Sequence, residues 1–144
     1  MKIPELKIGN ITARVPIIQG GMGVRVSLAS LASAVTNQGG IGTISCIGLG
    51  DIEGSAERCK RTSLEALVNE IHKARTLTDG YVAVNFMGVL SNVNELIDAS
   101  VREGIRFIVF GAGLPTRLPS LVPDPEVQPR LPLRQSRFPS SRSV

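Results

Sequence analysis

Histidine, cysteine and long apolar runs are scarce in this chain of 144 residues. Its two cysteines, Cys46 and Cys59, form neither a CxxC pair nor a metal-ligand cluster, so we expect reduced thiols. No apolar run reaches the roughly 18 residues that a membrane span needs. The first ten residues, MKIPELKIGN, lack the apolar core of a signal peptide. These absences predict a cytoplasmic protein that binds neither a membrane nor a metal ion.

Glycine-rich nucleotide motifs are present only in incomplete form. The segments GMGVRV, GLGDIE and GAGLPT each begin like the GxGxxG fingerprint of dinucleotide-binding folds but lack its final glycine. The chain contains no Walker A sequence either. The sequence therefore gives poor support to a dinucleotide site or a P-loop.

What the chain does have is a βαβ unit with a glycine turn between residues 15 and 45. The apolar run Val15–Ile18 is typical of a strand, and Gln19 leads from it into the turn Gly20–Gly23, which reads GGMG. Glycine tolerates positive φ and leaves room for a ligand beside the backbone. Ligands of α/β sheets bind at the carboxyl ends of the strands, which is where this turn is expected.

A helix is predicted between the turn and the next strand. Ser27 stands at its N-cap position, and Gly39 follows its end as a C′ residue. Its buried face is expected at the spacing i, i+3, i+4 and i+7, which selects Leu28, Leu31, Ala32 and Val35. A strand over residues 41–44 follows at once, and so short a connection predicts a parallel, right-handed crossover.

The same pattern continues along the chain. A second helix is expected from a capping box at Thr62 and Glu65 to near Gly80, and a third over residues 93–103. Strands are predicted over residues 81–86 and 105–110. We interpret the mixed-charge segment 48–61 as a lid-like loop or a short extra helix.

Polar and glycine residues mark the ends of these strands. Asn85 closes the strand over 81–86, and the strand over 105–110 runs into a second glycine turn, Gly111–Gly113. A polar group that ends an apolar strand is costly to bury without a partner, so Asn85 is a candidate ligand contact. Cys46 follows the strand over 41–44, and we favour a small packing residue over a group that faces a substrate.

The motifs PIIQGGMG, GGIGTIS, VAVNFM and IVFGAGLP, in this order and spacing, resemble the N-terminal half of the FMN-dependent nitronate monooxygenases, formerly called 2-nitropropane dioxygenases. The similar enoyl-acyl carrier protein reductase II enzymes share these motifs. The resemblance covers about residues 3–127. It implies an α/β fold, the first half of a (β/α)₈ TIM barrel with about four βα units. It also implies a flavin-dependent oxidoreductase whose small-molecule substrate is an alkyl nitronate or, in the alternative, an enoyl thioester.

The resemblance also implies roles for individual residues. Gly20, Gly21 and Met22 would contact FMN through main-chain groups, and Asn85 would hydrogen-bond the flavin. The substrate side of the ring would be lined by two further glycines, Gly111 and Gly113.

Two parts of the family's site do not occur in this sequence. The catalytic histidine of the family lies in a GGH segment that is missing here, so we assign no catalytic residue. The single histidine, His72, is expected to be a solvated helix residue. The later glycine turns that hold the FMN phosphate are missing too, so FMN binding by this chain would lack its phosphate clamp.

The last residues differ in composition from the rest. From residue 115 onward the chain has seven of its nine prolines and no glycine, and from Gln128 onward it has four arginines and no acidic residue. We predict a partial TIM-barrel flavin domain over residues 1–127 and a basic Pro/Arg/Ser-rich tail over 128–144, disordered or translated out of frame. Four arginines without interleaved aromatic residues are weak support for nucleic-acid binding, and we predict none.

The length leaves two functional hypotheses open. A barrel of this type needs about 250 residues, so we interpret the chain as a truncated or frameshifted member of the family. It either keeps a flavin site or is an inactive fragment without a catalytic base. In both cases the strand over 105–110 would be an open parallel edge, which favours self-association.

Overall fold

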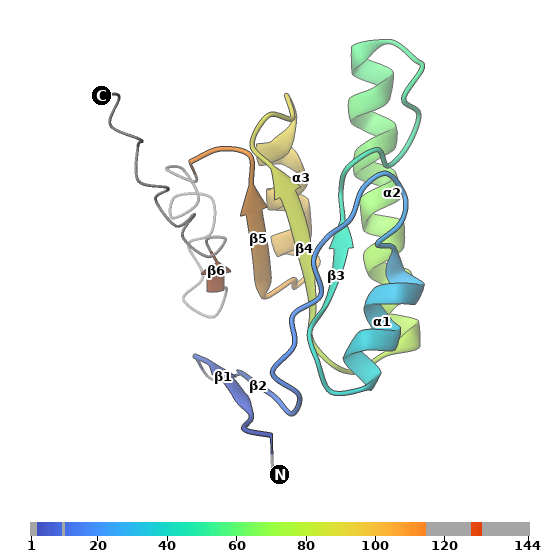
Figure 1. Ribbon diagram of the computed structural model, residues 1–144. Helices are drawn as coiled ribbons and strands as arrows, with labels where there is room; N and C mark the ends of the chain where they lie inside the picture. Colours follow the sequence, from blue (N-terminus) through green and yellow to red (C-terminus); the bar gives the residue numbers. More distant parts are fainter. Residues whose placement is uncertain (1–2, 10, 115–127, 131–144) are drawn as a thin grey trace, which may run out of the picture.

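The computed structural model describes residues 3–9, 11–114 and 128–130. A hairpin of β1 (Leu6–Ile8) and β2 (Ile11–Ala13) precedes a sheet built from β3 (Gly42–Ser45), β4 (Val82–Met87), β5 (Phe107–Gly111) and β6 (Gln128–Arg130). The helices are α1 (Ala29–Asn37), α2 (Ala56–Leu77) and α3 (Val93–Arg102). Figure 1 shows the hairpin below the sheet, α1 and α2 beside β3, and α3 behind β4 and β5. Among the helices of the described ranges, none combines the length and the apolar character needed to cross a membrane.

The sheet is parallel throughout, in the order β3-β4-β5-β6. Its register places Ser45 opposite Asn85, and Asn85 opposite Val109. Because side chains alternate between the two faces of a strand, these three residues share one face. The other face packs under the helices. The predicted α/β fold, the first part of a TIM barrel, is therefore confirmed.

Most of the apolar core lies between the sheet and the helices. All three helices contribute buried residues, namely Ala29, Ala32, Leu67, Ile71, Ala74, Leu96 and Ile97. The approach of α1 to β3 is very close, since a Cβ on Gly42 would lie 1.8 Å from the carbonyl oxygen of Ala32. Glycine at position 42 is thus what allows α1 to pack on β3.

The hairpin covers the opposite face at the amino ends of the strands. Its buried residues Ile8, Ile11 and Ala13 form one cluster with Ile41, Ala83 and Phe107. Each of the last three lies within one residue of the start of its strand, β3, β4 or β5. The hairpin therefore closes the amino end of the sheet.

The first predicted strand, over residues 15–18, is reduced to a single parallel bridge between Ile18 and Ile41. The N–H of Gln19 donates to the carbonyl of Ile41 at 2.9 Å, and the N–H of Ile41 donates to the carbonyl of Ile17 at 2.9 Å. The segment runs beside β3 as a neighbouring strand would. The regular ladder of backbone hydrogen bonds, however, does not extend beyond the pair Ile18 and Ile41.

The buried face of α1 is rotated away from the predicted one. Its buried residues are Ala29, Ala32, Ser33 and Thr36, whereas Leu31 is 37% exposed. The reason is the short distance between α1 and β3, which only small side chains can occupy. The apolar spacing of the larger residues was therefore a misleading signal at this helix.

The second helix begins earlier than predicted. α2 starts at Ala56, and the Ser55 side chain accepts a hydrogen bond from the N–H of Arg58 at 3.3 Å as its N-cap. Thr62 lies inside the helix, where its hydroxyl donates to the carbonyl of Arg58 at 2.9 Å. Residues 56–61, for which we expected a loop or a separate short helix, are the first turns of α2.

The remaining elements agree closely with the predictions. β4, α3 and β5 lie within two residues of the expected strands and helix, and Gly39 and Gly104 follow α1 and α3 with φ of +96° and +70°. The expected open edge of β5 is instead paired over Phe107–Val109 with β6. β6 comes from the tail for which no regular structure was expected, and residues 131–144 lie outside the described part of the chain.

Candidate functional site

Four segments meet at the carboxyl edge of the sheet, which we define as residues 20–23, 46–48, 87–88 and 111–113. The N–H of Cys46 donates to the carbonyl of Asn85 at 3.1 Å, and the N–H of Gly88 donates to the carbonyl of Gly111 at 2.9 Å. A Cβ on Gly23 would lie 2.8 Å from the Cβ of Ile47, so the glycine turn packs on the segment after β3. Parallel strands bring these segments together, as the order of motifs predicted.

Gly21 and Asn85, distant in sequence, are in direct contact at this edge. A Cβ on Gly21 would lie 2.4 Å from the Cβ of Asn85 and 3.0 Å from its Nδ2. Any larger residue at position 21 would displace the Asn85 side chain. The structure therefore brings together two of the residues for which the family resemblance implied contacts with the flavin.

The other nominated glycines differ in their surroundings. A Cβ on Gly20 or on Gly111 would meet no heavy atom within 4 Å, so both border open space. A Cβ on Gly113 would lie 3.4 Å from the Cα of Gly88, which is ordinary packing contact. Space beside a bare main chain is what a flat ligand requires, and Gly20 and Gly111 provide it.

Ser27 organises the glycine turn instead of capping α1. Its buried hydroxyl accepts hydrogen bonds from the N–H of Met22 at 2.9 Å and from Nε2 of Gln19 at 2.8 Å. The N-cap position belongs to Leu28, and the N–H of Ala29 donates to a carboxylate oxygen of Glu70 on α2 at 2.7 Å. The sequence suggested a local cap, whereas tertiary packing supplies the capping carboxylate from another helix.

Gln19 links the turn to β3. Its carbonyl accepts the hydroxyl of Thr43 at 2.6 Å, and its Oε1 accepts the N–H of Thr43 at 3.2 Å. Thr43 is fully buried. Sequence reasoning missed this pair, although a glutamine between an apolar run and a glycine turn is a signal for such a contact.

The main chain of Met22 is already engaged with Ser27. Besides the donation from the Met22 N–H, the carbonyl of Met22 accepts the N–H of Ser27 at 3.0 Å. The Met22 side chain is 51% exposed. Of the three residues expected to offer main-chain groups to a ligand, Gly20 and Gly21 therefore remain suited to it, while Met22 offers its side chain.

Arg25 holds the loop after β3 against the turn. Its φ is 56°, and its guanidinium donates to the carbonyls of Gly48 and Gly50. A Cβ on Gly48 would lie 2.3 Å from a methyl of Val24, which shows how tightly the two segments pack. The start of the segment 48–61 is thus tied to the glycine turn.

Cys46 behaves as a packing residue. It is 2% exposed within the core under the helices. Burial raises the pKa of its thiol from 9.0 to about 11, because the thiolate would lose its hydration. The thiol is therefore protonated and unreactive near neutral pH, in agreement with the packing interpretation.

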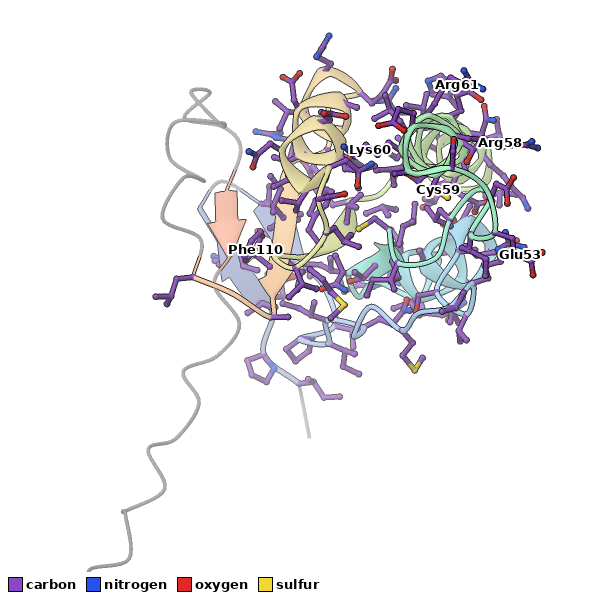
Figure 2. All side chains as sticks on the ribbon, turned by 90° about the horizontal axis from the view of Figure 1, so that it is seen from above. Glu53, Arg58, Cys59, Lys60, Arg61 and Phe110 are labelled. Carbon is purple, nitrogen blue, oxygen red and sulfur yellow. The ribbon has the colours of Figure 1, made fainter. Side chains whose placement is uncertain are left out.

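His72 lies far along α2 from the carboxyl edge. Its Nε2 pairs with a carboxylate oxygen of Glu103 at 2.7 Å, and its side chain is 55% exposed. Glu103 precedes β5, so the pair belongs to the amino end of the sheet. Other charged side chains also lie away from the carboxyl end of β5. Figure 2 shows Glu53, in the loop before α2, and Arg58, in the first turn of α2, apart from Phe110 of β5.

The carboxyl edge fits a flat ring better than a phosphate. The N–H groups of Gly20 and Gly21 donate to no other residue within the described ranges, and the half-buried Asn85 amide lies beside them. The segments of the edge contain neither lysine nor arginine. These residues would hold a ring by main-chain and amide hydrogen bonds, while a phosphate would need further groups.

Comparison with known proteins identifies a family and two similar folds. The family model described as nitronate monooxygenase matches residues 5–117. Among curated proteins the chain has no match. FabK from Thermotoga maritima is a similar solved structure, with 27% identity and a TM-score of 0.65 over 81% of this chain and 33% of that chain.

A second solved structure is similar in fold alone. It is an IMP dehydrogenase/GMP reductase-like protein from Corynebacterium glutamicum, with 18% identity and a TM-score of 0.64 over 89% of this chain and 42% of that chain. The chain thus spans between a third and a half of the length of these two structures.

Proposed function

We propose, because the chain belongs to the nitronate monooxygenase family, that its carboxyl edge holds the isoalloxazine ring of FMN for the oxidation of alkyl nitronates by O₂. The observation that carries the proposal is the contact between Gly21 and Asn85 beside the open main chain of Gly20. A ligand ring placed there meets backbone N–H groups without an intervening side chain.

Each residue at the edge has a distinct task in this proposal. Gly20 and Gly21 donate main-chain hydrogen bonds to the ring, and the amide of Asn85 bonds its edge. Gly111 leaves space for a small substrate, and Gly113 packs against Gly88 next to it. FMN, when bound, supplies the redox chemistry, since it accepts electrons from the substrate and passes them to O₂.

The side chains at the edge favour a substrate that is already deprotonated. Residues 20–23, 46–48, 87–88 and 111–113 contain no histidine, aspartate or glutamate, and the Cys46 thiol faces the core. A neutral nitroalkane must lose a proton from carbon, which requires a general base. A nitronate is already the carbanion form, so it suits this set of residues better.

The similarity to FabK favours a second candidate, the enoyl-acyl carrier protein reductase II type. There NAD(P)H would reduce the flavin and the flavin would reduce an enoyl thioester. The two candidates share the ring site and differ in what reduces the flavin.

Titration of the purified full chain with FMN tests the ring site, followed by flavin fluorescence and absorbance. We expect saturable binding that Gly20→Ala weakens about ten-fold or more, because a methyl group would occupy the space beside the ring. Gly54→Ala is the control, since the nearest atoms to its Cβ would belong to the flexible side chain of Arg58 and to a carboxylate oxygen of Asp51. Absence of binding by the wild-type chain would contradict the proposal and support an inactive fragment.

Anaerobic mixing of the flavin-loaded chain separates the two candidates. An alkyl nitronate should bleach the flavin absorbance, and air should restore it. Bleaching by NADH or NADPH but not by the nitronate would instead select the reductase.

A further inference from the structure

The hydroxyl of Ser27 uses its full hydrogen-bonding capacity on the glycine turn and its flank. It accepts from the N–H of Met22 and from Nε2 of Gln19, and it donates to the carbonyl of Gly20 at 3.4 Å. Two acceptor positions and one donor are all that a hydroxyl offers. Ser27 is also 0% exposed, so it has no alternative partner in solvent.

These contacts determine which way the peptide groups of the turn point. In a trans peptide the C=O and N–H are antiparallel, so a carbonyl held inward turns the next N–H outward. Thr43 holds the carbonyl of Gln19 and thereby turns out the N–H of Gly20. Ser27 and Gln19 hold the carbonyl of Gly20, which turns out the N–H of Gly21.

The next two peptides follow the same rule. Because the N–H of Met22 points to Ser27, the carbonyl of Gly21 points away from it. Because the carbonyl of Met22 accepts the N–H of Ser27, the N–H of Gly23 points away as well. Along the chain the groups turned away from Thr43 or Ser27 are therefore N–H, N–H, C=O and N–H, from Gly20, Gly21, Gly21 and Gly23.

We infer that Ser27 and Gln19 are positioning residues that aim this row of main-chain groups at one edge of the flavin ring. The inference rests on the proposed function. Along one edge, oxidised isoalloxazine carries N5 and O4 as acceptors, N3–H as a donor and O2 as an acceptor. That order is complementary to donor, donor, acceptor and donor. The turn thus recognises the polar edge of the ring, while the absence of side chains lets the ring approach.

Substitution of Ser27 tests the positioning role, with Ser33 as the matched control. Ser27→Ala frees the peptides at Gly20 and Met22 to rotate, and we expect riboflavin affinity to fall about ten-fold. Ser33 is also a buried serine, on α1, and its hydroxyl donates to the carbonyl of Ala74 at 3.3 Å. Ser33→Ala should lose comparable stability and keep the affinity. Gln19→Leu, at a half-buried position, is a second variant should Ser27→Ala fail to fold.

Flavin analogues test which groups the turn recognises. Riboflavin is the reference because it has the ring without the phosphate. 3-Methylriboflavin lacks the N3–H donor and 5-deazariboflavin lacks the N5 acceptor, so the wild-type chain should bind each about ten-fold more weakly. The Ser27→Ala or Gln19→Leu variant should discriminate less between riboflavin and these analogues, which a general loss of stability would not cause.

The outcomes distinguish this inference from the proposed flavin site on which it rests. No binding of riboflavin or FMN by the wild-type chain would overturn both. Binding that is equal for all three flavins, or that the Ser27 and Gln19 variants leave unchanged, would overturn the positioning role and leave the flavin site standing.

Discussion

The amino and carboxyl ends of the parallel sheet use the same residue type, glycine, for opposite purposes. At the amino end the would-be Cβ of Gly42 lies 1.8 Å from the backbone of α1, and the hairpin buries Ile8 and Ile11 to 1% exposure. At the carboxyl end Gly20 and Gly111 meet nothing within 4 Å. The absence of a side chain at Gly42 lets α1 pack on β3, whereas Gly20 and Gly111 border open space, which the proposed function assigns to a ligand.

The difference predicts that stability depends mainly on the amino end of the sheet and the proposed flavin binding on the carboxyl end. Barrels of this class keep stability at the amino end and chemistry at the carboxyl end. Here the amino end is apolar and closed, whereas the carboxyl end is a network of hydrogen bonds centred on Ser27 with main-chain groups turned outward. Substitutions at the two ends should therefore change different measured quantities.

The largest effect is expected from Gly42→Ala. The added methyl group would overlap the backbone of Ala32, so α1 would have to move off β3. We expect no cooperative unfolding transition in urea by far-UV circular dichroism. Gly20→Ala is the matched glycine variant and should unfold like the wild-type chain. A normal transition for Gly42→Ala would show that α1 is free to shift.

Ile11→Ala tests the closed end with a smaller change. Loss of this fully buried side chain should lower the free energy of unfolding by about 2–4 kcal/mol, through lost burial and the cavity left under the hairpin. Urea denaturation measures the loss, and flavin affinity of the folded protein should stay constant. A fall in affinity would mean that the two ends are coupled.

Cys46 should make stability fall at high pH. Burial raises the pKa of its thiol from 9.0 to about 11. The free energy of unfolding therefore keeps the full contribution of the buried, protonated thiol below pH 9 and loses it as the pH rises to 11. The loss is about 2–3 kcal/mol. Urea denaturation at pH 8 and pH 10.5 should show a steeper decline for the wild-type chain than for Cys46→Ala. Equal declines would contradict the burial of the thiol.

The smallest change in stability is expected from Gly111→Ala. A methyl group there enters open space, so the free energy of unfolding should change by less than about 0.5 kcal/mol. The nitronate concentration that half-bleaches bound flavin should rise, since the methyl group narrows the space for substrate. An unchanged concentration would place the substrate elsewhere along the edge.

Much of this architecture was predictable because it depends on local pattern. The apolar runs of β4 and β5, the stripe of α3 and the glycines after α1 and α3 were found from spacing and composition. The faces and bounds of α1 and α2 were not, because they depend on how closely α1 approaches β3 and on Ser55, a cap outside the apolar pattern. The pairing of β5 with β6 escaped prediction for a related reason, since residues 128–130 carry no apolar alternation.

The sequence by itself determined the order of the strands and helices and the presence of bare glycine turns where strands end, since these follow from periodicity and from the freedom of glycine. The tertiary structure alone decided that Gly21 touches Asn85 and that Ser27 binds the turn rather than capping α1. The physical reason is that hydrogen bonds between distant segments depend on the register of a folded sheet. No local spacing in the chain encodes that register.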